Sequence, residues 1–302
     1  MRQACIVITL FAAALVATFA SAQSGSTAAR TPQLAAPNAA GVAMGHYHFV
    51  VRDVAANAQF WTTLGAPSAK ATAVPSKAGA MTIVKLTDVI IVLTQGQSSG
   101  VSEGSVLNHI AFRVPSLDAL EARGLKIERL GPDLPGIGNT RTPEGERIEL
   151  FENAATNVGF TPDAGLTDPI AERHNRPISV PIASHHFHLY LPDEAAVAAA
   201  KAWYAKTFGG TPGKRWHYEA VDLPGININL GVAPKPAQPT KGRMLDHIGL
   251  EVTGLAAFTK KLEALGVRFD ERYHKNADGV GEARLTDPWG VSIELTEGLR
   301  RW

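Results

Sequence analysis

The segment His46-Tyr47-His48-Phe49-Val50-Val51 alternates between two kinds of position, with apolar side chains one, three and five places after His46. Three later segments, opening at His109, His186 and His247, repeat this arrangement. A period of two is typical of a β-strand with one buried face. The pattern therefore predicts four strands that each carry a histidine, together with the residues two and four places later, on the open face.

Helix-like and further strand-like stretches follow these openings. The helix-like stretches have an apolar face and end at a glycine, as Phe60–Leu64 does before Gly65 and Trp203–Phe208 before Gly209. Further strands are predicted over residues 81–86, 89–94, 147–151, 226–230 and 291–296. The repeating unit is therefore a βαβββ module, present four times, and the predicted fold class is α+β.

The spacing of the four histidines indicates a second level of repetition. His46 and His109 are 63 residues apart and His186 and His247 are 61 apart, while each first-pair histidine lies 140 or 138 residues before its counterpart. We therefore expect the first module to pair with the second and the third with the fourth. This gives a domain over 43–153, a Pro- and Gly-containing linker over 154–183 and a second domain over 184–300.

The N-terminus has the pattern of a secretory signal. Arg2 is followed by an uncharged, mostly apolar run over 5–19 and by a small-x-small site at Ala20-Ser21-Ala22. The run is short for a membrane span, which needs about 20 apolar residues. We therefore predict a signal peptide over 1–22, a flexible leader over 23–42, and a periplasmic or secreted protein with no membrane attachment after cleavage.

The composition describes a globular protein without a strong charge. Of the 302 residues 45% are hydrophobic and 19% charged, and the formal net charge is +1. No basic field exists to bind nucleic acid. The single cysteine, Cys5, falls inside the predicted signal, so the mature chain is expected to have no disulfide. A small-molecule partner is the expectation that remains, and a homo-oligomer is compatible with the sequence.

Two closing strands add a carboxylate to the histidines. Glu149 and Glu294 alternate with apolar neighbours such as Ile148 and Leu150, so each glutamate faces the same open side as the histidines. Two imidazoles and one carboxylate suit a divalent ion such as Fe²⁺, Mn²⁺, Ni²⁺ or Zn²⁺ and leave coordination positions open. With modules paired as neighbours, the two predicted metal sets are His46, His109, Glu149 and His186, His247, Glu294.

These features together resemble the vicinal oxygen chelate superfamily of glyoxalases, bleomycin-resistance proteins and extradiol dioxygenases. The resemblance rests on the histidine-led strands, the aromatic helices that end at glycine and the closing Ile-Glu-Leu strands, and it covers residues 44–153 and 184–298. It implies that paired modules curl into cup-shaped sheets around a metal, with ligands from the first and last strands. The predicted architecture is thus four βαβββ modules in two cup-shaped domains.

Departures from the family pattern bear on the reaction. Glyoxalases of the family take a fourth ligand from a strand where this chain has Val92 and Asn229. The dioxygenase signature resembles Pro288-x-Gly290-x-x-x-Glu294, although Arg284 stands where its tyrosine is expected. The resemblance favours a dioxygenase-like enzyme that holds vicinal substrate oxygens on a metal, with Fe²⁺ as the first expectation. A glyoxalase-type lyase or isomerase and a non-catalytic binding protein remain alternatives.

Other polar residues are assigned roles by their place near the predicted cups. The second domain has more polar residues of this kind, so its metal set is the favoured active site, with two working sites as the alternative because both sets are complete. Strand packing or a surface position is the alternative for each single residue. The catalytic candidates are His188, Tyr273 and His274, and the substrate-binding candidates are Tyr190, Arg113 and Glu251. His185, which points away from the cup by alternation, and His174 in the linker are expected at the surface.

Overall fold

A computed structural model describes Met1 and residues 34–65, 71–76, 79–155, 159–174, 176–277 and 279–301. The strands are β1 (Val42–Val51), β2 (Ala71–Ser76), β3 (Gly79–Lys85), β4 (Ile90–Gln95), β5 (Leu107–Val114), β6 (Glu128–Arg129), β7 (Ile137–Arg141), β8 (Arg147–Glu152), β9 (Phe160–Pro162), β10 (Ala183–Leu191), β11 (Thr211–Arg215), β12 (Tyr218–Leu223), β13 (Ile226–Val232), β14 (Leu245–Val252), β15 (Glu271–Lys275), β16 (Gly281–Thr286) and β17 (Ser292–Glu297). The helices are α1 (Val54–Gly65), α2 (Leu117–Glu121), α3 (Glu194–Phe208) and α4 (Leu255–Ala264), with 3₁₀ turns η1 (Ala171–His174) and η2 (Leu299–Arg301). The four βαβββ modules of the prediction are confirmed.

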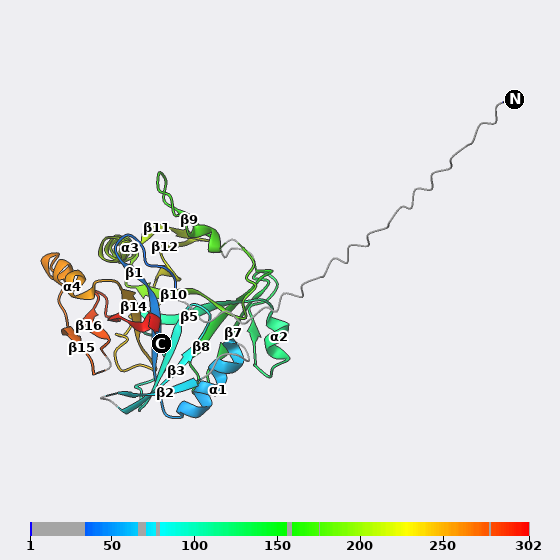
Figure 1. Ribbon diagram of the computed structural model, residues 1–302, viewed down its shortest axis with the longest axis horizontal. Coiled ribbons are helices and arrows are strands. Elements are labelled where there is room, and N and C mark those ends of the chain that lie inside the picture. The colour runs from blue at the N-terminus through cyan, green and yellow to red at the C-terminus, as the bar shows by residue number, and fades with distance from the viewer. Residues whose placement is uncertain are drawn as a thin grey trace. The chain divides into compact units, whose positions relative to one another are not determined.

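The strands form two mixed sheets, which Figure 1 shows with the helices around them. The first sheet has the order β15-β16-β17-β14-β1-β4-β3-β2, and the second has the order β6-β7-β8-β5-β10-β13-β12-β11-β9. The first module therefore shares a sheet with the fourth, and the second shares one with the third. The expectation that neighbouring modules pair was wrong, and neither sheet corresponds to residues 43–153 or 184–300.

The chain connections explain the crossed pairing. Residues 96–106 lead from the first module to the second, and residues 233–244 lead from the third to the fourth. Main-chain bonds join the two connections, because Ser99 N donates to Gly242 O and Val106 N donates to Gln238 O, both at 2.8 Å. The connections thus run side by side and carry the chain from one sheet to the other.

The centre of each sheet repeats the same local geometry. Antiparallel β1 and β14 place His48 opposite His247 and His46 opposite Gly249. Antiparallel β10 and β5 place His188 opposite His109 and His186 opposite Ala111. In both pairs the register shifts just before the first histidine and just after the second. The two sheets are therefore duplicated units down to their irregularities.

One continuous core lies behind both open faces. Phe112 of β5 contacts Tyr47 of β1 and Trp61 of α1, with ring centroids 6.2 and 5.8 Å apart. These side chains are fully buried, as is Tyr204 of α3. Removing such aromatic surface from water is the main stabilising contribution to a core. This shared core covers one face of each sheet. The opposite faces, which carry the histidines, therefore point away from it.

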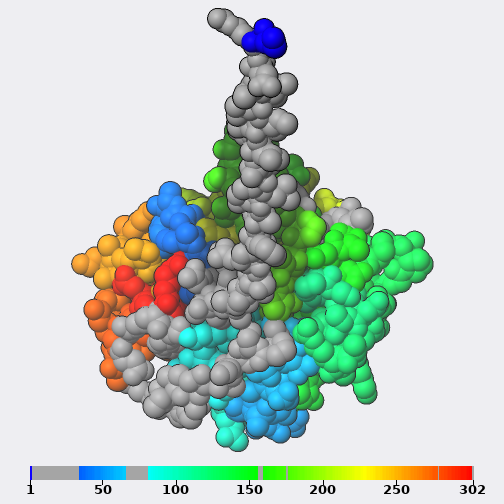
Figure 2. Space-filling view, turned by 45° about the vertical axis from the view of Figure 1, so that its right-hand side comes forward, coloured from blue at the N-terminus to red at the C-terminus, as the bar shows by residue number. Residues whose placement is uncertain are grey.

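The end of α3 shows that part of the predicted leader is structured. Asp193 caps the start of α3 and Gly209 ends it with φ of 70°, a conformation that favours glycine. Asn38 Nδ2 then donates to the carbonyl oxygens of Phe208 and Gly209, at 2.9 and 3.0 Å. Arg300 Nη1 donates to Leu34 O at 2.9 Å, and Figure 2 shows the chain's red C-terminal end beside blue early residues. Residues 34–42 are therefore packed, contrary to the prediction of a flexible leader.

The linker prediction is also only partly right. Within residues 154–183, β9 adds an edge strand to β11 of the second sheet, and η1 buries His174. The expectation of a solvated His174 was wrong. The predicted signal peptide, apart from Met1, and the first residues of the leader lie outside the described residues. No helix in the described part of the chain is long and apolar enough to cross a membrane.

Candidate metal centre

The first sheet assembles one set of two histidines and a glutamate. His46 comes from β1, His247 from β14 and Glu294 from β17, and they are 2%, 1% and 7% exposed. Glu294 Oε2 lies 2.9 Å from His46 Nε2 and 3.4 Å from His247 Nε2. We call these residues the first-sheet triad. The two imidazole rings meet edge to face with centroids 5.6 Å apart, so both Nε2 atoms converge on one carboxylate oxygen.

Neighbouring charged groups orient this triad. Asp246 Oδ1 lies 2.7 Å from His247 Nδ1, an arrangement that places the ring proton on Nδ1 and leaves the lone pair on Nε2. Arg284 donates to the other oxygen of Glu294 through Nε and Nη2, at 3.0 and 2.8 Å. Oε2 is thereby left facing the histidines. A carboxylate on the far side of a histidine is the usual support of a metal-binding imidazole.

The electrostatics keep the triad's carboxylate charged. Burial alone would raise the pKa of Glu294, but contacts with His247 and His46 outweigh it and hold that pKa well below its usual range. Burial likewise opposes the charged form of His247, but Asp246 and Glu294 raise its pKa. Burial lowers the pKa of His48 well below its ordinary value, and the nearby imidazoles lower it further. His48 is therefore a neutral base beside a charged carboxylate.

The first-sheet triad fits a divalent metal ion. Among the described residues, buried His46 Nδ1 and His247 Nε2 have no hydrogen-bond partner. His46, His48 and His247 each offer a nitrogen within 4.8 Å of the others. Converging imidazole nitrogens with a carboxylate oxygen are the donor set of divalent first-row metals. His46, His247 and Glu294 would hold such an ion, with His48 at its side.

Glycine at position 249 makes room for this arrangement. A Cβ built on Gly249 would lie 1.9 Å from His46 Cε1 and 2.0 Å from His46 Nδ1. The ring of His46 therefore occupies the space that any other side chain would fill. Gly249 is paired with both His46 and Glu294 in the sheet, so it sits at the centre of the triad.

One side of the first-sheet triad is apolar. Val92 lies beside His48 in the parallel pairing of β1 with β4 and cannot bind a metal. It belongs to a buried apolar cluster together with Leu34, Ile83, Ile90, Val280 and Leu299. Leu34 and Leu299 bring the two ends of the described body into this cluster. The polar groups around the triad therefore have an apolar cluster beside them on the side of β4.

The second sheet assembles the other three predicted ligands. Glu149 Oε2 lies 3.3 Å from His109 Nε2 and 3.4 Å from His186 Nε2, and we call these residues the second-sheet triad. The rings of His109 and His186 meet edge to face at 5.5 Å, as in the first sheet. All six predicted residues are thus brought into two sets, but the predicted grouping was wrong. Crossed module pairing exchanges the partners of His46 and His186.

A cavity of about 220 Å³ opens over the second-sheet triad. His188 and Tyr190 line it, as the sequence predicted for a cup, with stacked rings 4.5 Å apart. Tyr218 meets His188 edge to face, and burial followed by the neighbouring Tyr190 raises the pKa of Tyr218 to about 12. Trp216 also lines the cavity and is 51% exposed. The second-sheet cavity therefore has an aromatic wall.

The remaining predicted site residues are not gathered at one site. Tyr273 packs against the common core, and His274 on edge strand β15 contacts Arg272 and Glu282. Both belong to the first sheet, whereas His188 belongs to the second. The grouping of His188, Tyr273 and His274 as one catalytic set was therefore wrong.

The two charged candidates for substrate binding hold chain segments instead. Arg113 donates to the carbonyl oxygens of His174 and Arg176, at 3.1 and 2.6 Å. Glu251 accepts from Gly298 N, Leu299 N and the Thr296 hydroxyl group. Neither residue lines the second-sheet cavity. Of the three predicted substrate-binding residues, the structure places only Tyr190 there.

Several residues that shape the sites were missed. Asp246 immediately precedes His247, and this adjacency was the available signal. Arg284 was noticed only as a departure from a family pattern, although alternation along its strand could have placed it beside Glu294. His185, expected at the surface, is buried with its Nδ1 2.9 Å from His186 Nδ1. No sequence signal indicated that contact.

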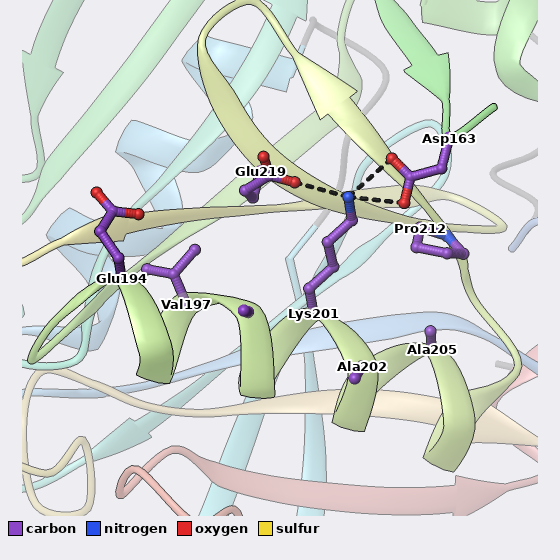
Figure 3. A pocket seen from close by; sticks show the side chains of 9 residues that line it. Asp163, Glu194, Val197, Lys201, Ala202, Ala205, Pro212 and Glu219 are labelled. Carbon is purple, nitrogen blue, oxygen red and sulfur yellow. Dashed lines mark hydrogen bonds and ion pairs between the residues drawn. The ribbon is translucent and has the colours of Figure 1, made fainter.

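A second hollow of about 500 Å³ lies along α3, away from the histidine clusters (Figure 3). Lys201 Nζ lies between Asp163 and Glu219, with contacts of 2.8 and 2.6 Å, and alanines of α3 form much of the wall. Burial works against the charged form of Lys201, but the two carboxylates raise its pKa. The amine is held as a neutralised ion pair rather than as a reactive group.

Comparison with protein families identifies part of the chain directly. Residues 184–295 match the profile of the Glyoxalase/Bleomycin resistance protein/Dioxygenase superfamily. The match covers 112 of the chain's 302 residues. The matched residues include strands β10–β13 of the second sheet and β14–β17 of the first. His186, His247 and Glu294 lie among them. A comparison with curated protein sequences finds no match.

Solved structures share the fold of almost the whole chain. Glyoxalase I from Zea mays is 15% identical with a TM-score of 0.61, and the alignment covers 86% of this chain and 94% of that one. A putative dioxygenase from Bacillus subtilis subsp. subtilis str. 168 is 12% identical with a TM-score of 0.61, covering 88% and 86%. At these identities the likeness shows the two-sheet fold alone, and it is equally close to both kinds of protein.

Proposed function

We propose that the protein is a metal-dependent enzyme whose active site is the first-sheet triad, and that its substrate is a small molecule that offers two adjacent oxygens to the metal. One observation carries the proposal. His46 Nε2, His247 Nε2 and Glu294 Oε2 converge in a buried site, while Asp246 holds His247 in the metal-binding tautomer. When bound, the metal supplies Lewis acidity and, as Fe²⁺, a site for oxygen activation.

The lack of a donor atom at the Val92 position favours a dioxygenase-like reaction, with His48 acting as a base rather than as a ligand. Val92 stands beside His48 where a fourth ligand would be placed, and its side chain has no donor atom. Three protein ligands leave room for two substrate oxygens and for dioxygen. Arg284 holds Glu294 in place, and the apolar cluster around Val92 excludes water and favours an apolar substrate body.

His48 supplies the proton chemistry of such a site. Its ring lies 4.4 Å from that of His247, and its Nε2 lies 2.9 Å from the Thr94 hydroxyl oxygen. Burial and nearby imidazoles keep it neutral, so it is available to take a proton from a substrate hydroxyl group. The same feature supports the alternative of a glyoxalase-type isomerase, in which a base moves a proton beside a carbonyl group.

Metal analysis followed by two assays tests the proposal. The purified chain is loaded anaerobically with Fe²⁺, Mn²⁺, Ni²⁺ or Zn²⁺, and bound metal is measured for the wild type, Glu294→Gln and the matched control Glu149→Gln. We expect metal binding that is lost only in Glu294→Gln. Oxygen consumption with catechols would support the dioxygenase, and turnover of a hemithioacetal without oxygen would support the isomerase. Ligand binding with no metal in any preparation would leave a binding protein.

We also propose that the protein is exported and acts outside the cytoplasm. Arg2, the apolar run and Ala20-Ser21-Ala22 indicate export with cleavage after Ala22. Both triads are complete within one chain, so the proposed reaction needs no partner subunit. Intact-mass measurement of the protein from periplasmic and cytoplasmic fractions tests this. A full-length mass in every fraction would contradict export with cleavage.

A further inference from the structure

The second-sheet cavity has more positive than negative charge in its wall. Arg147 and Arg215 line it together with the single carboxylate of Glu149, whereas at the first-sheet triad one arginine, Arg284, is paired with Glu294. Arg147 stands two residues before Glu149, where the first sheet has Ser292 before Glu294. The cavity is therefore an electropositive version of a duplicated site.

Two polar neighbours meet the outer nitrogen of His109. Arg147 Nη2 makes a short contact with His109 Nδ1, and Asn108 Oδ1 lies 3.0 Å from the same nitrogen. A guanidinium group only donates hydrogen bonds and an amide oxygen only accepts them, so these contacts leave both tautomers of His109 open. The other histidine of the triad, His186, has contacts that fix its tautomer.

Arg215 fixes the tautomer of His186 through one further residue. Arg215 Nη1 donates to His185 Nε2, so His185 carries its proton on Nδ1. This proton is donated to His186 Nδ1, 2.9 Å away, which leaves the His186 proton on Nε2, 3.4 Å from Glu149 Oε2. A protonated nitrogen cannot bind a metal. His109, His186 and His188 also offer nitrogens within 4.8 Å of one another, but with its proton on Nε2 His186 presents no lone pair to an ion at the centre of the triad. In this tautomer the second-sheet triad does not fit a metal ion, unlike the first-sheet triad with Asp246.

The cavity wall indicates the kind of molecule that would bind instead. Its 220 Å³ is below the roughly 300–1,000 Å³ of pockets for drug-sized ligands, so it suits a single ring. Tyr190, Tyr218 and Phe151 supply aromatic faces, and Leu134 and Ile137 supply apolar ones. Flat apolar walls beside guanidinium groups recognise a ring that carries a carboxylate.

Trp216 strengthens this interpretation. It adopts φ of 52°, a conformation that is strained for a bulky side chain. It is half exposed yet lines the cavity, and its ring contacts that of His217 at 3.9 Å. Folding alone gains little from a strained, exposed tryptophan, whereas a ligand under it would gain a stacking surface.

We propose that the second-sheet cavity binds a small aromatic carboxylate without a metal. The carboxylate would lie against Arg147 and Arg215, and the ring would lie between the tyrosines and Trp216. This site is separate from the proposed catalytic centre, because the two triads lie on different sheets.

Calorimetric titration of the full chain with benzoate tests the proposal. Benzyl alcohol serves as the uncharged probe and acetate as the anion without a ring. We expect benzoate to bind in the presence of a chelator, and Arg147→Gln to weaken it at least about tenfold, since a charge-assisted hydrogen bond is lost. Arg141→Gln is the matched control, because Arg141 also pairs with Glu103 but does not line the cavity.

Trp216→Gly provides a variant that should fold well. Glycine tolerates the positive φ, so we expect unchanged or higher stability together with weaker benzoate binding. Equal binding of benzyl alcohol or acetate, no benzoate binding at millimolar concentrations, or unchanged affinity in Arg147→Gln would each overturn the proposal.

Metal counting tests the remaining part and separates it from the proposed function. We expect one ion per chain, lost in Glu294→Gln and kept in Glu149→Gln. Two ions per chain, or an ion lost in Glu149→Gln, would refute the metal-free second-sheet site. An absence of any ion would refute the proposed function at the first sheet, while the benzoate result would still be decided by its own titration.

Discussion

Replacing Gly249 with alanine is the sharpest test of the first-sheet triad. The added Cβ would lie 1.9 Å from His46 Cε1, whereas an ordinary contact begins at 3.4 Å. The imidazole must therefore shift by roughly 1.5 Å, the difference between these distances. Alanine suits the backbone of a strand, so the side chain of His46 is what has to move.

The expected effect on metal binding is much larger than the effect on folding. Overpacking usually lowers stability by about 1–3 kcal/mol, and the strand gains back roughly 0.5–1 kcal/mol when glycine is replaced by alanine. Loss of an orienting neighbour alone weakens a metal by about 10–100-fold. Displacing His46 itself should therefore lower affinity by at least about 100-fold, with unfolding free energy reduced by at most about 2.5 kcal/mol.

Two measurements on the same preparations check this. Metal affinity is measured by competition with a chelator, and unfolding free energy by urea titration of the metal-free protein. Ala111→Gly is the matched control, because Ala111 stands opposite His186 in the second sheet as Gly249 stands opposite His46. The control should keep the affinity of the wild type. If Gly249→Ala binds metal as tightly as the wild type, His46 is not a ligand and the reasoning fails.

Three further predictions use other contacts. Asp246→Asn removes the carboxylate that fixes the tautomer of His247, and metal affinity measured by chelator competition should fall about 10–100-fold. Burial raises the pKa of Glu146 to about 7, so the folded state binds a proton that the unfolded state has released, and stability falls as pH rises from the ordinary carboxyl pKa to about 7. Glu146→Gln should therefore match the wild type near pH 4 and exceed it by about 3 kcal/mol near pH 8 in urea titrations, an advantage that exposed Glu128→Gln should not show. Asn38→Ala should lower unfolding free energy by about 1–3 kcal/mol in the same titrations, because two carbonyl oxygens at the end of α3 lose their donor.

The repeating modules could be predicted because their signal is local. Alternation within five or six residues decides which side chains face the core, and it placed Glu149 and Glu294 on the same face as the histidines. The parallel pairing of β5 with β8 and of β14 with β17 agrees with that prediction. Face and strand identity depend on neighbouring residues, which the sequence displays directly.

The pairing of the modules could not be predicted in the same way. Equal spacings show which modules are copies of one another, but copies do not have to be neighbours in space. The preference for sequential elements to pack together favoured the wrong partners. What overrides it is the bonding of residues 96–106 to residues 233–244, a contact across more than a hundred residues. No periodicity reports such a contact.

The two triads show how a duplicated backbone acquires different chemistry through single side chains. Position by position, Asp246 corresponds to Asn108, Arg284 to Asn139 and Ser292 to Arg147. In the first sheet Asp246 accepts a hydrogen bond from His247, and Arg284 donates to Glu294. The lone pairs of His247 Nε2 and Glu294 Oε2 therefore face a common centre. The second sheet places a guanidinium donor, Arg215, on His185, which turns the N–H group of His186 inward. The direction of these hydrogen bonds, rather than the identity of the inner residues, would thus separate the proposed cation site from the proposed anion site on the same fold.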